Sequence, residues 1–126
     1  MDEKKFLKVE NLSAYKIAFN LSNCVWDIIS KWDSFSKNTI GIQWVRATDS
    51  ISANIAEGFG RYTKRDKINF YRYSYGSAQE SIDWVKKVKQ RNLLKDEEYN
   101  YIINEFNKLP KEINSLIKFT NSRLTI

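Results

Sequence analysis

The chain contains no histidine, and it has only one cysteine, one proline and four glycines among 126 residues. The lack of histidine removes the most frequent general base of enzymes, most zinc sites and the Glu-x-x-His motifs of di-iron bundles. The lone Cys24 cannot form an internal disulfide, and its neighbours Leu21, Val25 and Ile28 predict that it is buried as a small hydrophobic residue. We therefore expect a non-enzymatic protein without a metal or another cofactor.

Long hydrophobic runs are missing as well. No segment approaches the roughly 18 uncharged apolar residues of a membrane helix, and the first ten residues, MDEKKFLKVE, lack the apolar region of a signal peptide. A chain of this length fits one domain with a real core. We expect a soluble, cytoplasmic protein in which residues 1–126 form a single domain.

Apolar residues recur every three or four positions, which predicts an all-α fold. This pattern predicts helices over about 12–32, 40–58 and 64–91, and a fourth helix from residue 96 onward. Short connections between four such helices are typical of an up-down-up-down four-helix bundle.

The ends of these helices carry capping signals. Asn11 and Asp96 are the predicted N-caps of the first and fourth helices, and Thr63 with Asp66 three residues later predicts a capping box for the third. Pro110 should kink or split the fourth helix near Lys108, because proline lacks an amide hydrogen and clashes with the preceding turn.

Positive charge is concentrated in one part of the chain. The segment 61–95 has ten basic and three acidic residues, a net charge of +7, whereas the whole chain carries +6. Such a concentration is typical of a surface that meets phosphate groups, although a solvated lysine-rich face is an alternative. Tyrosines in the same segment suit base stacking or a protein interface; Tyr62 and Tyr73 are predicted to be exposed, and Tyr71 and Tyr75 to lie in the core. The candidate nucleic-acid-binding residues are Arg61, Lys64, Arg65, Lys67, Arg72, Lys86, Lys87, Lys89 and Arg91.

Polar residues also follow a helical spacing. We predict that they form a structural network between the second and third helices, with Glu57 in a buried ion pair. Acid–base chemistry by Glu57 and Glu80 is the alternative, and the structural interpretation is favoured because basic residues share the same stripe. Gly76, inside a predicted helix, indicates a close approach of two helix backbones. The predicted network consists of Arg46, Ser50, Asn54, Glu57, Ser77 and Glu80.

The same region resembles a known family. The run Gln43, Arg46, Ala47, Ser50, Ile51, Asn54, Ile55, Ala56, Glu57, Gly58, Gly60 and Arg61, followed by Gly76, Ser77 and Glu80, is similar to the signature of the four-helix-bundle family of the ribosomal-RNA intervening-sequence protein. The resemblance implies a small non-enzymatic bundle that assembles into a homopentameric ring, in which the polar stripe fixes helix to helix or subunit to subunit. One branch is similar in fold to the accessory variability-determinant protein of diversity-generating retroelements, a basic pentamer that binds nucleic acid and a reverse transcriptase. Ser36 departs from the family pattern, in which a proline is common in the first loop.

Charge and resemblance together predict an oligomeric, non-catalytic scaffold that binds RNA or DNA through a basic surface on the hairpin of the second and third helices and along the third helix. The alternative hypothesis is a protein-interaction adaptor, such as an accessory subunit of a reverse transcriptase, that does not itself contact nucleic acid.

Overall fold

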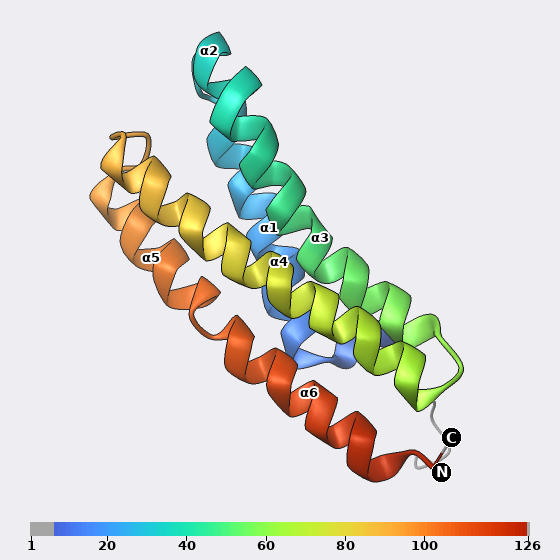
Figure 1. Cartoon of the computed structure of the whole chain (residues 1–126). Coiled ribbons are helices and arrows are strands. Elements are labelled where there is room, and N and C mark those ends of the chain that lie inside the picture. Colours follow the sequence, from blue (N-terminus) through green and yellow to red (C-terminus); the bar gives the residue numbers. More distant parts are fainter. Residues whose placement is uncertain (1–6, 126) are drawn as a thin grey trace.

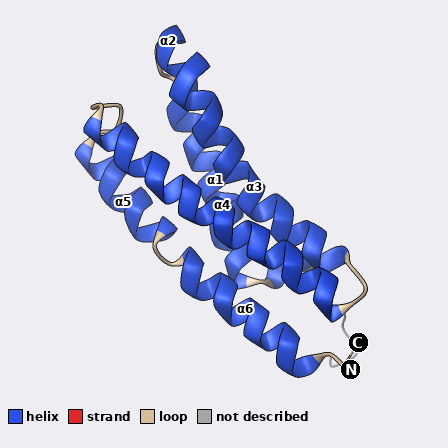
Figure 2. Ribbon diagram, in the orientation of Figure 1, coloured by secondary structure: helices blue, strands red, loops and turns tan. Residues whose placement is uncertain are grey.

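The computed structural model describes residues 7–125, and every regular element in that range is helical (Figure 2). A short 3-10 turn, η2, precedes α1, and a π-helical turn, η3, leads into α3. Within this range no helix is long and apolar enough to cross a bilayer. The elements are η2 (Val9–Asn11), α1 (Ser13–Ser30), α2 (Ser34–Ser36), η3 (Lys37–Gly41), α3 (Ile42–Gly60), α4 (Lys64–Gln90), α5 (Asp96–Phe106) and α6 (Leu109–Arg123).

The predicted four-helix bundle is confirmed. The helix α1 runs antiparallel to α3, α4 returns beside α3, and α5 with α6 forms the fourth helix of the bundle (Figure 1). That fourth helix is split rather than kinked, because it stops at Phe106 and restarts at Leu109, with Pro110 in the first turn of α6. Proline is tolerated in a first turn, where its missing amide has no helical partner to lose.

One hydrophobic core runs through the bundle and draws on all the long helices. Trp44 of α3, Tyr71 of α4 and Phe106 of α5 are its largest fully buried side chains. The prediction of a buried Tyr71 is therefore confirmed, whereas Tyr75 is half-buried at the edge of the core. Cys24 is also half-buried, less enclosed than predicted, and the pKa of its thiol is raised mainly by this burial.

The helix caps are only partly as predicted. The Thr63 hydroxyl accepts a hydrogen bond from the Asp66 amide at 3.1 Å, which confirms the cap of α4. The predicted caps at Asn11 and Asp96 are wrong. Asn11 lies inside η2, where its side chain accepts from the Lys8 amide, and Asp96 is already the first residue of α5. At α5 the capping oxygen comes from Glu98, two residues into the helix from Asp96.

A close contact between α3 and α4 lies near the end of α3. A β-carbon on Gly58 would stand 2.8 Å from Cε1 of Tyr71 and 2.9 Å from the Lys67 carbonyl oxygen. The buried Ser74 hydroxyl donates to the Ile51 carbonyl at 2.8 Å, which also ties the two helices together. The prediction for Gly76 is wrong, since a β-carbon there would meet nothing within 4 Å.

Bulky side chains occupy the other end of the bundle. Trp32 and Trp44 stack with their ring centroids 6.0 Å apart, and the Trp32 indole donates to the Leu93 carbonyl at 3.1 Å. At one end of the bundle, Gly58 lets α3 and α4 pack closely together. At the other end, the bulky rings of Trp32 and Trp44 fill the space between the α1–α3 hairpin and the α4–α5 hairpin. The α1–α3 hairpin and the α4–α5 hairpin diverge at this second end (Figure 1).

The tip of the α1–α3 hairpin is a compact turn around Ser36. The Asp33 carboxylate accepts from the Ser36 amide at 3.0 Å, and this bond is the main reason that the pKa of Asp33 is lowered. Ser36 itself is buried, and Gly41 packs so closely that an added β-carbon would lie 3.0 Å from Ile29. The loop around Ser36 is therefore an ordered helical turn, although it lacks the proline that is common there in the family pattern.

Candidate nucleic-acid interface

The basic segment of the sequence is divided in space. Because α4 rises by 1.5 Å per residue, Lys67 and Lys86 are separated by about 30 Å along its axis. Nine candidate residues therefore fall into an N-terminal group, a C-terminal group and Arg72 between them. The N-terminal group is Arg61, Lys64, Arg65 and Lys67, and the C-terminal group is Lys86, Lys87, Lys89 and Arg91.

Most cations of the N-terminal group have partners within the bundle. Arg61 forms an ion pair with Glu57 at 2.9 Å and lies 4.6 Å over the Phe70 ring. Lys67 donates to the Phe59 carbonyl at 2.7 Å, near the C-terminus of α3, where the helix dipole favours a cation. Burial lowers the pKa of Lys67. Lys64 donates to the Asn121 carbonyl at 3.3 Å. These contacts tie α4 to the ends of α3 and α6.

Two cations of the C-terminal group also form ion pairs. Lys87 contacts Asp83 at 2.7 Å, and Lys89 contacts Asp96 at 2.7 Å. Hydrogen bonds from these lysines lower the pKa of both aspartates. All four side chains are substantially exposed, so solvent screening leaves each pair with little effect on stability.

The other four candidates, Arg65, Arg72, Lys86 and Arg91, are exposed and have no carboxylate partner in residues 7–125. Arg65, Arg72 and Lys86 are exposed and are separated by seven and fourteen residues. These intervals are close to whole numbers of helical turns, so the three side chains follow one outward face of α4. We call them the α4 outer stripe.

The polar stripe of α3 is half-exposed, and the structure does not join it to α4 as predicted. Ser50 donates to the Arg46 carbonyl at 2.8 Å, and Asn54 donates to the Ser50 carbonyl at 2.9 Å. Glu57 pairs with Arg61, the residue directly after α3, and the Glu57 side chain is 50% exposed, so the predicted buried pair is wrong.

On α4, Glu80 accepts from the Trp84 indole at 3.1 Å, and Ser77 is half-buried. Within the described residues, no side-chain hydrogen bond crosses from the α3 stripe to Ser77 or Glu80. The side chains of Tyr62 and Tyr73 are 77% and 59% exposed, which confirms the prediction that these two tyrosines lie at the surface.

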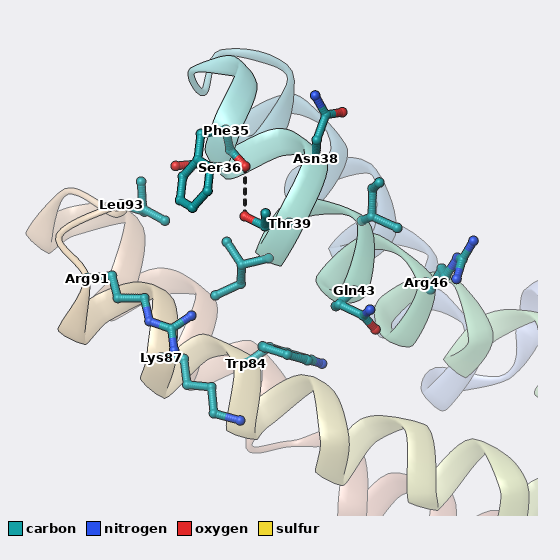
Figure 3. A pocket seen from close by; sticks show the side chains of 12 residues that line it. Phe35, Ser36, Asn38, Thr39, Gln43, Arg46, Trp84, Lys87, Arg91 and Leu93 are labelled. Atoms are coloured by element: carbon teal, nitrogen blue, oxygen red, sulfur yellow. Dashed lines mark hydrogen bonds between the residues drawn. The ribbon is translucent and has the colours of Figure 1, made fainter.

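A pocket lies where the two hairpins diverge, between the tip of the α1–α3 hairpin and the C-terminal part of α4 (Figure 3). Its volume is about 970 Å³. Three cations line it and no carboxylate does. We call it the wedge pocket; its lining residues are Phe35, Ser36, Asn38, Thr39, Ile40, Ile42, Gln43, Arg46, Trp84, Lys87, Arg91 and Leu93.

Trp84 forms part of the floor of the wedge pocket. Its ring is held at the edge by the bond to Glu80, and Lys87 Nζ lies 4.5 Å from the ring centroid. Figure 3 shows the indole edge-on, with Lys87 on one side of its plane and Gln43 on the other, while Arg91 extends from the end of α4 toward Lys87. One face of the ring is thus covered by a cation and the other faces the pocket.

A second hollow lies beside the start of α3 and shares Ile42 and Arg46 with the wedge pocket. This apolar groove has a volume of about 400 Å³ and is lined mainly by Trp26, Ile29, Ile42 and Val45, with Lys37 and Arg46 among the remaining lining residues. Trp26 is 61% exposed there, and Phe35 at the nearby tip is 76% exposed. Large exposed aromatic side chains of this kind are enriched at protein interfaces.

Sequence reasoning identified Arg46, Lys87 and Arg91 but did not bring them together. Arg46 was assigned to the polar network and the other two to the basic surface, because no local pattern relates residues more than 40 positions apart. Trp84 was missed as a site residue. Its spacing of three and seven residues from Lys87 and Arg91 on one helix is a signal that could have found it.

The fold and sequence have known counterparts. The model of the 23S rRNA-intervening sequence protein family matches residues 10–115. A crystal structure of a protein with unknown function from the S23 ribosomal protein family of Bacteroides thetaiotaomicron superimposes with a TM-score of 0.74 at 22% identity. The match covers 83% of this chain and 98% of that one. Among curated proteins, none matches the sequence.

Proposed function

Because the chain belongs to the 23S rRNA-intervening sequence protein family, we propose that it is a non-catalytic, oligomeric scaffold that binds nucleic acid in the cytoplasm. The family name associates its members with ribosomal RNA and supports RNA as the first ligand to test. The relation to accessory proteins of diversity-generating retroelements is part of the same proposal.

The α4 outer stripe is the observation that carries this proposal. Arg65, Arg72 and Lys86 are exposed, share one face of α4 and have no ion pair in the described part of the chain. Cations that are not neutralised by protein carboxylates remain available to phosphates. The stripe extends over 21 residues, or about 32 Å, which is enough to contact several phosphates of one structured nucleic acid.

Contacts of this kind fix the protein on the phosphate backbone and do not read sequence. We therefore expect affinity to depend steeply on salt, because each neutralised phosphate of a duplex contributes about 0.9 to the slope of log K against log salt. The proposed ligand is structured RNA recognised through its backbone, with the other basic residues of α4 adding to the local potential.

Fluorescence anisotropy with a labelled RNA hairpin across a salt series tests this directly. The triple variant Arg65→Glu, Arg72→Glu, Lys86→Glu should lose binding at moderate salt, and any remaining slope should fall by about 2 to 3. The matched control is Lys16→Glu, Lys111→Glu, Lys118→Glu, which makes the same change of charge on exposed positions of α1 and α6. Equal losses in the two variants would show that net charge, and not the stripe, controls binding.

The oligomeric part of the proposal rests on the family resemblance and on the α3 stripe. Arg46, Ser50 and Asn54 make no side-chain bond to α4 among residues 7–125, which leaves their outward groups available to a neighbouring subunit. A subunit has a mass of 14.9 kDa, so the proposed pentamer has a mass of about 75 kDa. Light scattering at several protein concentrations measures this mass, and a value near 15 kDa throughout would overturn the oligomer.

The apolar groove beside Trp26 favours a second candidate function, a protein-interaction adaptor such as an accessory subunit of a reverse transcriptase. Truncating an aromatic side chain that is buried at the centre of an interface typically weakens the binding free energy by more than 1 kcal/mol. Affinity capture after nuclease treatment separates the two candidates. A protein partner that is retained by wild type and lost in Trp26→Ser supports the adaptor, and recovery of nucleic acid alone supports the scaffold.

A further inference from the structure

We propose that the wedge pocket holds one unpaired nucleotide of a single-stranded or looped nucleic acid, with its base on Trp84 and its phosphate at Arg91. This inference rests on the proposed nucleic-acid-binding function and adds a preference for unpaired nucleotides to it. The α4 outer stripe accounts for backbone binding alone, whereas the wedge pocket is a hollow with an aromatic floor and cationic walls.

The chemistry of the lining residues points to an anion with an aromatic ring. The cations Arg46, Lys87 and Arg91 line the pocket, and no aspartate or glutamate does. Glu80 and Asp83 lie nearby, but Glu80 accepts the Trp84 indole hydrogen and Asp83 pairs with Lys87. Arg46 and Arg91 are both exposed and have no ion pair in the described part of the chain. Of the two, Arg91 lies on the same side of the pocket as Trp84 (Figure 3).

Trp84 is suited to stacking because its ring is already oriented. The bond from its indole nitrogen to Glu80 fixes the ring edge, and Lys87 covers one face at 4.5 Å. A ring held in place loses little conformational entropy when a base stacks on its open face. Gln43 also lines the pocket, on the side of the indole opposite Lys87 (Figure 3), and its amide has both a donor and an acceptor for the edge of a base.

The volume of the pocket, about 970 Å³, lies in the range of about 300–1,000 Å³ that is usual for small-molecule sites. Phe35 on α2 and Leu93 after α4 border the hollow from the two hairpins. A duplex cannot insert a paired base between the hairpins without flipping it out of the stack, which is unfavourable because pairing and stacking are lost. The pocket should therefore discriminate between unpaired and paired nucleotides.

The experiment compares single-stranded and blunt duplex RNA of equal length by fluorescence anisotropy. In Trp84→Leu we expect single-strand affinity to fall about 5- to 150-fold, the effect of losing one base–aromatic stack, while duplex affinity stays within about twofold of wild type. Tyr101→Leu is the matched control, since Tyr101 is an exposed aromatic residue of α5 outside the wedge pocket and its replacement should leave both affinities unchanged. Circular dichroism checks that each variant is folded.

Arg91→Gln is the second variant, which keeps the test decisive if Trp84→Leu fails to fold. It should also weaken single-strand binding more than duplex binding. Adenosine monophosphate as a competitor distinguishes the source of the nucleotide: displacement only at millimolar concentration supports a strand that is also held by the outer stripe, and displacement at micromolar concentration supports a free nucleotide as the ligand.

Equal losses for the two RNAs, or no loss in either variant, would overturn the nucleotide pocket. If the outer-stripe variant still abolishes duplex binding in that case, the proposed function stands without the pocket. Absence of any RNA binding at low salt overturns both proposals. Wild-type capture of an acidic peptide in place of RNA, lost in Trp84→Leu, would assign the pocket to a protein partner.

Discussion

Gly58 of α3 lies so close to Tyr71 of α4 that a β-carbon on the glycine would stand 2.8 Å from the tyrosine ring. The backbone of α4 is equally close, since the Lys67 carbonyl oxygen would lie at 2.9 Å. A flexible side chain can move aside, but a helix backbone moves only with the whole element. This contact therefore sets the distance between α3 and α4 at one end of the bundle.

The first prediction is that Gly58→Ala destabilises the protein. Overpacking typically costs about 1–3 kcal/mol, and the better helix propensity of alanine returns about 1 kcal/mol of this. We expect a lower melting temperature in a thermal scan followed by circular dichroism. An unchanged or higher melting temperature would show that α3 and α4 separate easily at this point.

The second prediction concerns Gly76, which provides the matched control. It lies inside α4 with open space around its missing β-carbon. Gly76→Ala should raise the free energy of unfolding by about 0.5–1 kcal/mol, because alanine loses less backbone entropy in a helix. Lower stability only at concentrations where the protein assembles, together with a changed oligomeric mass, would implicate a neighbouring subunit at Gly76.

The third prediction is that Glu57→Ala has a small effect on the stability of the subunit. The side chains of Glu57 and Arg61 are 50% and 43% exposed, and an exposed pair four residues apart contributes about 0.3–0.5 kcal/mol. Urea denaturation measures this difference. A loss of several kcal/mol would mean that the pair is buried in the assembled protein, as a subunit contact would require.

The fourth prediction is a loss of stability at alkaline pH that depends on Tyr71. Burial raises the pKa of Tyr71 to about 12, from the ordinary value of 10.0, although a hydrogen bond with Thr120 acts in the opposite direction. Below pH 10 both folded and unfolded chains keep this proton. Between about pH 10 and pH 12 the unfolded chain releases it and the folded chain retains it, so unfolding becomes more favourable by about 1.4 kcal/mol per pH unit.

Urea denaturation of wild type and Tyr71→Phe between pH 9 and pH 12 measures this contribution. The phenylalanine variant loses the titrating group, so its stability should fall less steeply over this range. Parallel curves for the two proteins would contradict the assignment.

Much of the fold could be predicted from the sequence because helix formation is local. The spacing of apolar residues gave the bounds of α1 and α4 to within two residues, and Pro110 located the division between α5 and α6. Thr63 identified the start of α4 for the same reason, since its hydroxyl bonds an amide only three residues away. Asn11 and Asp96 were misplaced because a capping side chain can begin a helix from several neighbouring positions.

For the candidate site, the sequence predicted which kinds of residue are present but not how they are arranged in space. Helical spacing placed Arg46 and Glu57 on one face of α3, but spacing alone cannot say whether a polar face is buried by another helix or left to solvent. Tertiary structure decided that the stripe is half-exposed and that Gly58, not Gly76, is the point of close contact.

The sequence by itself determined an all-α bundle with a basic third helix, because composition, periodicity and capping act over a few residues. Only the tertiary structure decided that Lys64 and Lys67 are bound by carbonyl groups at the ends of α6 and α3. It also decided that Arg46, Trp84 and Arg91 share a pocket. The physical reason is packing. Small residues draw α3 and α4 together near Gly58, the stacked Trp32 and Trp44 occupy the other end, and the hollow between the diverging hairpins belongs to no single helix.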